Sequence, residues 1–134
     1  MAIFKHLFLW IILMSGAVMT FSACADHLSK DQPPKHLYKV LSFEDWKKSQ
    51  SQAFLALPKE DEKFIHLSKE DQLERITEKY WSDVPEYIIL KIETKQLPGR
   101  LVYETNPGGA NKYYHLYDGS IPLKAVVEAK TIKN

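Results

Sequence analysis

The sequence lacks the residues and motifs that mark the common catalytic and metal centres. Its single cysteine, Cys24, has no partner for an internal disulfide, so the folded part must be stabilised by its own core. It contains no HxH or HExxH spacing, and we therefore expect no metal site. No GxSxG motif or phosphate-binding glycine-rich loop occurs, and the PGG segment at 107–109 is too short to form one.

The chain also lacks an excess of charge of either sign. The 134 residues carry 18 basic and 17 acidic side chains, a formal net charge of +1. Lys5 is the one Lys, Arg, Asp or Glu within residues 1–25, so the remaining chain has 17 charges of each sign. A domain that binds nucleic acid is usually basic, with its Lys and Arg clustered, and we expect no such partner.

The longest apolar run lies at the N-terminus. Residues 1–25 begin with a charged start and continue into the uncharged segment LFLWIILMSGAVMTF. Ser15 and Gly16 interrupt this segment, and it is shorter than the ~20 residues that a membrane-spanning helix needs. The pattern predicts a secretory signal that carries the protein across the inner membrane of a bacterium.

The end of the signal permits more than one outcome. FSAC, at 21–24, resembles a bacterial lipobox, which predicts a lipid on Cys24 and an anchor in the cell envelope. ACA, at 23–25, fits ordinary signal peptidase, which would release a soluble periplasmic protein beginning at Asp26. An uncleaved anchor is the third alternative.

The rest of the chain predicts a polar tether at 26–36 and one small α+β domain at 37–132. The tether, DHLSKDQPPKH, contains Pro33 and Pro34. Apolar periodicity and Ser N-caps predict two helices near the N-terminus, and strand-like runs follow them. We expect a bent, mostly antiparallel split sheet, with a hairpin at Asp118-Gly119. The expected strands are 37–41, 64–67, 86–93, 101–104, 113–117 and 123–131, and the expected helices are 43–54 and 69–81.

A histidine near the end of a short strand is the first candidate site residue. Side chains alternate along a strand, so Phe64, His66 and Ser68 share one face. Ser68 directly precedes a predicted helix, whose N-terminus would disfavour the charged form of His66. A neutral His66 beside Ser68 suits hydrogen bonding to a ribose or phosphate group.

A second strand carries the other candidates. Tyr113, His115 and Tyr117 share a face, and Glu104, in the neighbouring segment LVYE, is a candidate to orient a hydroxyl or act as general base. Two strands with histidines flanked by aromatic residues could line one small-molecule cleft. The alternative for each residue is structural: His66 as a hydrogen-bonded core residue, Glu104 as a solvated acid and the aromatic residues as packing.

The chain contains, in this order, the segments Tyr38, Trp46, FIHLS at 64–68, Gln72, YE at 103–104 and HLY at 115–117. Taken together, these segments resemble the domain-of-unknown-function 952 family. That family is typified by GFIHcS…Q followed by FPHlYG, and the resemblance covers about residues 37–130. Where the family commonly has His after the first-strand Tyr, this sequence has Lys39, and YYH replaces the usual Phe-Pro-His.

The resemblance implies an ADP-ribosyltransferase-like fold, with a cleft between the halves of a split sheet. Active members of that superfamily cleave NAD, which makes NAD a candidate ligand, although NAD is scarce outside the inner membrane. By order along the chain, Lys39, His66 and Glu104 fall nearest to the positions that hold the ribose, stack on nicotinamide and direct transfer.

Three functions follow, and nothing in the sequence sets the oligomeric state. The first is a site for a nucleotide-like ligand, NAD or ADP-ribose, onto which His66 and His115 both open. The second is a non-catalytic lipoprotein that binds a protein or an envelope component through exposed aromatic residues. The third is a transferase fold that has lost its chemistry. For the first function, His66 and Glu104 are the expected catalytic residues, and Tyr38, Lys39, His66, Ser68, Tyr113, His115 and Tyr117 are the expected ligand contacts.

Overall fold

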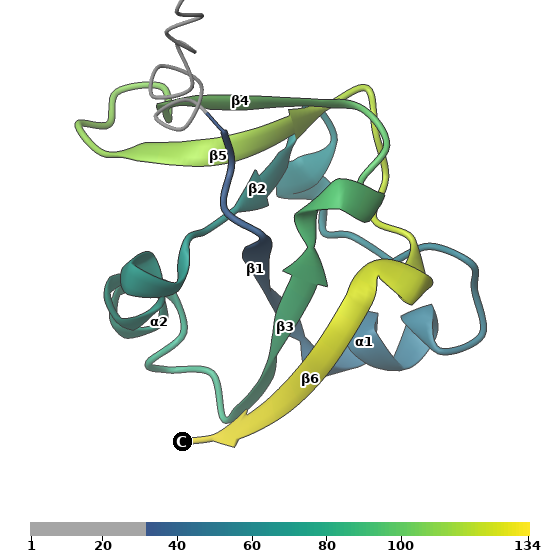
Figure 1. Cartoon of the computed structure of the whole chain (residues 1–134). Coiled ribbons are helices and arrows are strands. Elements are labelled where there is room, and N and C mark those ends of the chain that lie inside the picture. Colours follow the sequence, from purple (N-terminus) through teal and green to yellow (C-terminus); the bar gives the residue numbers. More distant parts are fainter. Residues whose placement is uncertain (1–31) are drawn as a thin grey trace, which may run out of the picture. The chain divides into compact units, whose positions relative to one another are not determined.

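The structure is a computed structural model that describes residues 32–134. The predicted signal, Cys24 and most of the predicted tether lie outside the described residues. The described compact unit, Pro33–Asn134, is an α+β domain with two three-stranded antiparallel sheets (Figure 1). Within this described part, no helix combines the length and apolar character that crossing a membrane would require.

The first sheet has the strand order β1-β3-β6, with β1 at His36–Ser42, β3 at Glu86–Glu93 and β6 at Val126–Lys133. The central strand, β3, is the largely apolar segment EYIILKIE, whose bounds agree with the prediction. The helix α1, Phe43–Ser49, follows β1 directly and begins at the Ser42 N-cap, whose hydroxyl accepts a hydrogen bond from Asp45 N.

The second sheet has the order β2-β5-β4 and comes from the middle of the chain. Its strands are β2 at Ile65–Leu67, β5 at Lys112–Tyr117 and β4 at Arg100–Thr105. The helix α2, Leu73–Tyr80, follows β2 after a short 3-10 turn. Figure 1 shows β4 and β5 running across the top of the domain, with β3 and β6 below them and α2 to one side.

The two sheets meet where β1 approaches the end of β2. Tyr38 N donates to Ser68 O at 2.8 Å, and Ser68 N donates to Tyr38 O at 2.9 Å. Both sheets also contribute to one hydrophobic core, so the predicted split sheet is observed as two sheets that pack together. The fully buried core members include Leu37, Leu41, Leu67, Ile88, Leu90, Ile92 and Leu116.

Two local predictions were wrong. The first helix ends at Ser49 rather than near residue 54, because the Ser49 hydroxyl donates to Asp45 O and accepts from Ala56 N, which turns the chain. The turn at Asp118-Gly119 does not form a hairpin, since the strand after it, β6, pairs with β3 in the other sheet. The hairpin partner of β5 is β4.

Candidate functional site

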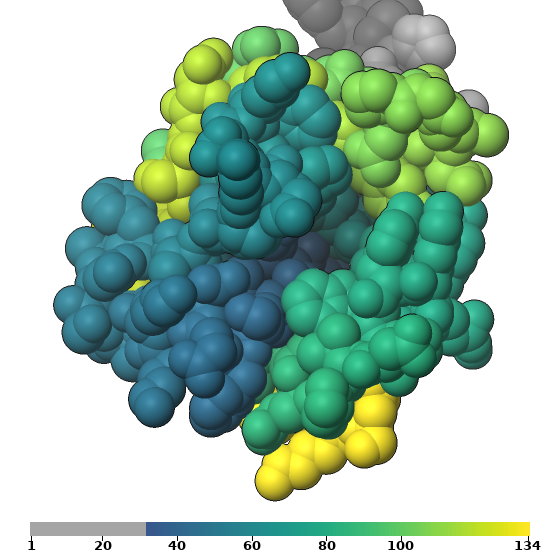
Figure 2. All heavy atoms as spheres, turned by 180° about the vertical axis from the view of Figure 1, so that it is seen from behind, coloured from purple at the N-terminus to yellow at the C-terminus, as the bar shows by residue number. Residues whose placement is uncertain are grey.

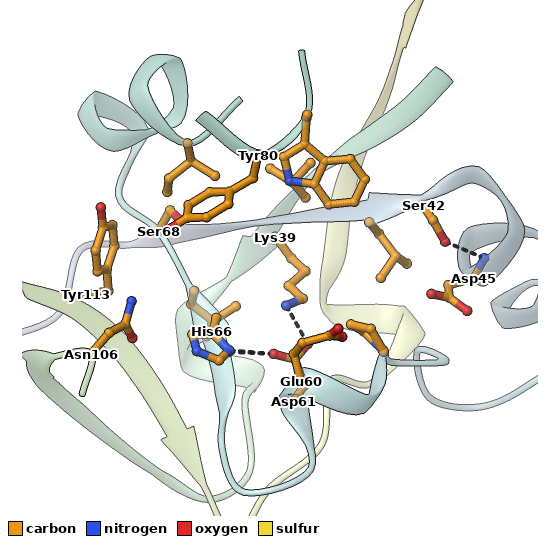
Figure 3. Close-up of a pocket in the computed structure, with 16 residues that line it drawn as sticks. Lys39, Ser42, Asp45, Glu60, Asp61, His66, Ser68, Tyr80, Asn106 and Tyr113 are labelled. Atoms are coloured by element: carbon orange, nitrogen blue, oxygen red, sulfur yellow. Dashed lines mark hydrogen bonds and ion pairs between the residues drawn. The ribbon is translucent and has the colours of Figure 1, made fainter. Parts of the chain in front are cut away.

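A cavity of about 530 Å³ opens on one face of the domain, between the end of α2 and the segment that precedes β2. Figure 2 shows this face hollowed, with the dark blue of β1 visible at the base of the hollow. Both sheets contribute to its wall: Lys39 comes from β1, and His66 comes from β2. Tyr80 and Trp81, at the end of α2, and Tyr113, from β5, add aromatic surface (Figure 3).

The wall of the cavity contains a polar cluster of three side chains, Lys39–Asp61–His66. Lys39 Nζ lies 2.5 Å from Asp61 Oδ2, and His66 Nδ1 lies 2.7 Å from Asp61 Oδ1. The backbone N–H of His66 also donates to Asp61 Oδ1, at 3.1 Å. The carboxylate is 1 % exposed and the Lys39 side chain 7 %, so this carboxylate joins side chains of both sheets away from water.

Burial and pairing act against each other on the pKa values of this cluster. Burial raises the pKa of Asp61, but the hydrogen bonds from His66 and the charge of Lys39 outweigh it and hold the pKa below its usual value. Burial also lowers the pKa of Lys39, and the attraction of Asp61 does not fully offset that effect. Asp61 is therefore a carboxylate at neutral pH.

This geometry sets which nitrogen of His66 meets a ligand. The Asp61 carboxylate can only accept a hydrogen bond, so His66 Nδ1 carries a proton and donates to it. Nε2 is then the ring nitrogen that is left for a ligand. The His66 side chain is 39 % exposed and lines the cavity. An imidazole oriented by a buried carboxylate can accept a hydrogen bond at Nε2, or take a proton there as a general base.

His115 is buried directly behind His66. It is 1 % exposed, stacks on Phe64 with ring centroids 4.1 Å apart, and does not line the cavity. Its Nδ1 lies 2.9 Å from Glu104 Oε1, and its Nε2 lies 2.8 Å from Asn106 Oδ1. Asn106 does line the cavity, and the His66 ring, whose centroid is 5.3 Å from that of His115, lines it too, so His115 supports the site through these two side chains.

Glu104 is held by two donors. The Tyr117 hydroxyl donates to Glu104 Oε1, and His115 contacts the same oxygen. The hydrogen bond from Tyr117, followed by that from His115, lowers the pKa of Glu104. The same hydrogen bond raises the pKa of Tyr117. Glu104 thus stays ionised and fixes one side of the His115 ring.

The structure divides the predicted site residues into two groups. Lys39, His66, Ser68 and Tyr113 line the cavity, whereas Glu104, His115 and Tyr117 form the hydrogen-bonded layer behind it. Tyr38 lies in neither group. It lines a shallow groove with Glu70 and Lys91, because alternation along β1 points it away from Lys39.

Sequence reasoning missed Asp61 and Asn106. Asp61 belongs to the charged run KEDEK at 59–63, a pattern that ordinarily indicates a solvated segment, and only the tertiary structure buries it. Asn106 opens the loop NPGGANK, where Asn usually signals a turn. In the described residues, no group of three or more His, Cys, Asp or Glu side chains could hold a metal ion.

The fold of this domain resembles solved structures of protein CC0527 from Caulobacter crescentus. Its crystal structure is 26% identical, with a TM-score of 0.62, and the match covers 72% of this chain and 84% of that one. The solution NMR structure of the same protein is 25% identical, with a TM-score of 0.63, and the match covers 75% and 86% of the two chains. A double mutant of that protein, also solved by crystallography, matches at 26% identity and a TM-score of 0.62.

No curated protein matches the sequence. The family described as "Protein of unknown function (DUF952)" matches residues 35–129, a range that holds every strand of the second sheet and both helices. This range also contains all the residues of the Lys39–Asp61–His66 cluster. The chain belongs to the DUF952 family.

Proposed function

We propose that the cleft binds a nucleoside-like small molecule, a planar ring joined to a ribose, of the kind found in NAD and ADP-ribose. The observation that carries the proposal is the His66 imidazole, oriented by Asp61, with Nε2 free in a cavity that has aromatic walls. A cavity of about 530 Å³ has the size of sites that enclose small organic ligands.

The chemistry of the walls matches the two parts of such a ligand. Tyr80, Trp81 and Tyr113 offer flat apolar surface for a ring. His66 and Ser68 offer hydrogen-bonding atoms suited to the hydroxyls of a sugar. A few polar groups between apolar walls are the usual composition of a small-molecule site.

Charge argues for placing any phosphate groups outside the cleft. Among the described residues that line the cavity, Lys39 is the only lysine or arginine, and Asp61 already neutralises it. Asp45 and Glu60 add negative charge to the same wall. A diphosphate would meet repulsion there, so the ring and ribose occupy the cleft, and phosphates, where present, extend into solvent.

The proposal assigns no transfer reaction. In an ADP-ribosyltransferase-like site a later acid directs transfer, and Glu104 is the residue that chain order favours for that role. Its Oε1 is engaged by both Tyr117 and His115, which supports a positioning role for Glu104 and leaves His66 as the group placed to act on the ligand. We place the domain in the bacterial envelope on the predicted signal alone, and the scarcity of NAD there favours a nucleoside over NAD itself.

Isothermal titration of Pro33–Asn134 with adenosine, nicotinamide riboside, ADP-ribose and NAD tests the proposal. We expect at least one nucleoside to bind, and His66→Ala to weaken it by about tenfold, or ~1.4 kcal/mol, because a hydrogen bond inside the cleft is lost. His36→Ala, a second histidine of the same domain that lies outside the cavity, is the matched control and leaves binding unchanged. Failure of all four compounds to bind would overturn the proposal.

A further inference from the structure

The strand β4, Arg100–Thr105, forms a regular outer edge of the second sheet. It pairs with β5 without a register shift, and no backbone hydrogen bond joins it to any other segment that the structure describes. Figure 1 shows β4 as the uppermost strand of the domain, with β5 beneath it. Within the described part of the chain, its outer row of N–H and C=O groups is therefore open to pairing with another strand.

The other strands at the sheet edges are short, interrupted or joined to each other. The strand β2 has only three residues, and its end is bridged to β1 through Tyr38 and Ser68. The ladder between β6 and β3 has a register shift at Lys91–Ile92, and β6 also carries lysines. Short strands, bulges and lysines are the usual features that keep an edge from pairing, and β4 has no lysine, proline or bulge.

The two charged side chains of β4 have unused binding capacity. Arg100 and Glu104 share one face of the strand, but at ~3.3 Å per residue they lie roughly 13 Å apart and cannot pair with each other. None of the described ion pairs involves Arg100, whose guanidinium lies over the Tyr117 ring. Glu104 uses Oε1 for both of its described hydrogen bonds and is 38 % exposed, so Oε2 is available.

The sequence of β4 is complementary to itself when a second copy runs antiparallel to it. With a two-fold axis at Val102, Arg100 of each copy faces Glu104 of the other, and Leu101 faces Tyr103. Moving the axis by one residue in either direction would place Val102 opposite one of the two charges. The pairing would also cover Tyr103, a large side chain that is 42 % exposed. Charge therefore favours both a second copy as the partner and one register.

We infer that β4 pairs with β4 of a second copy of this chain, antiparallel about Val102, so that the β2-β5-β4 sheets of the two copies become continuous. The inference is independent of the proposed function, because no residue of β4 lines the cavity. Arg100 of the second copy would reach the available oxygen of Glu104, whose other oxygen contacts His115 behind the cleft. The paired segment is short, and we expect a dissociation constant of about 10–100 µM.

Single-cysteine variants of Pro33–Asn134 test the pairing, because this unit contains no cysteine of its own. Val102→Cys places a thiol at the two-fold axis, where the Cβ atoms of facing residues lie about 5 Å apart, and we expect an intermolecular disulfide under mild oxidation. Thr105→Cys, on the same strand, is the matched control. Its two copies would lie ~20 Å apart and should not cross-link. No disulfide in Val102→Cys, or equal cross-linking of the two variants, would overturn the inference.

Sedimentation velocity tests the role of charge without an added thiol. We expect the wild-type unit to pass from monomer to dimer between about 10 and about 500 µM. Arg100→Glu brings like charges together across the axis and should weaken the dimer at least about tenfold. Lys47→Glu, the same change of charge at an exposed position of α1, should leave it unchanged. A monomer at every concentration, or a dimer that Arg100→Glu does not weaken, contradicts the inferred pairing.

Discussion

His66 and His115 face each other across the β2–β5 ladder, yet one ring lines the cleft and the other is buried behind it. Each ring contacts a carboxylate through Nδ1: His66 contacts Asp61, and His115 contacts Glu104. The pair thus combines a ring that is available to a ligand with a ring that supports the wall. This division of roles gives His66→Ala and His115→Ala different expected effects, the first on binding and the second mainly on stability.

Replacing Lys39 tests the buried ion pair. Lys39→Met fills much of the same volume but leaves the Asp61 carboxylate buried without its cation, and we expect a loss of about 3 kcal/mol in the free energy of unfolding. Urea unfolding followed by circular dichroism measures the change. Lys47→Met, at an exposed position of α1, is the control and should alter stability by less than about 0.5 kcal/mol. Equal stability of the two variants would show that the ion pair contributes nothing.

The lowered pKa of Asp61 predicts sensitivity to acid. Its pKa is below the usual 3.8 in the folded state, so its contribution to stability is complete above pH 3.8 and is lost as the pH falls from 3.8 toward the folded pKa. Thermal unfolding between about pH 5 and pH 2 should therefore show a steeper loss of stability for the wild type than for Asp61→Asn. Glu78→Gln, on the exposed side of α2, should follow the wild-type curve. Parallel curves for the wild type and Asp61→Asn would contradict the assignment.

Tyr117 controls the ionisation of Glu104. Tyr117→Phe removes the hydroxyl that donates to Glu104 Oε1, so the pKa of Glu104 should rise toward its usual 4.5. Titration of 13C-labelled side-chain carboxyl groups by NMR measures this pKa directly. Tyr103→Phe is the control: it lies on the strand that carries Glu104 but leaves the hydrogen bond between Tyr117 and Glu104 in place. A Glu104 titration that is identical in Tyr117→Phe and the wild type would refute the hydrogen bond.

Gly119 is needed because the backbone at Pro98 approaches it closely. A Cβ at position 119 would lie 2.1 Å from Pro98 O, so Gly119→Ala must displace the chain, and we expect a loss of about 2 kcal/mol or more. Gly108→Ala is the matched comparison. Its Cβ would meet nothing within 4 Å, and only its positive φ of 76° is unfavourable, at a cost of about 1 kcal/mol. Chemical denaturation ranks the two, and a larger loss for Gly108→Ala would contradict the account.

Local physics predicts most of the strands of this domain. The run at Glu86–Glu93 is largely apolar, which indicates a central strand whose bounds can be located from the sequence. Strand pairing puts His66 and His115 on the same face of the second sheet, but of these two residues, both predicted to open onto one cleft, only His66 lines the cavity. The pairing of β6 was not predictable in the same way, because a turn such as Asp118-Gly119 indicates only that the chain reverses and leaves the partner strand open.

The site was less predictable, because its supporting residues are ordinary in sequence. Asp61 precedes His66 by five residues within a charged run, and nothing local distinguishes a buried carboxylate there from a solvated one. Its position depends on Lys39, which lies 22 residues earlier in the sequence and is brought near by the bridge between Tyr38 and Ser68. Long-range packing of this kind is not encoded in the pattern of a single segment.

Asp61 lies in the short segment Lys59–Asp61, outside both sheets, and contacts one side chain from each. Asp61 thus links the two sheets through its side chain, so the distance between the sheets and the orientation of the His66 imidazole are coupled. A substitution far from the cleft that shifts one sheet relative to the other would therefore reorient the imidazole. Conversely, a ligand that fixes the imidazole would stabilise the contact between the two sheets. Ligand binding in the cleft would then slow the hydrogen exchange of the Tyr38 and Ser68 backbone amides, whose hydrogen bonds join the two sheets.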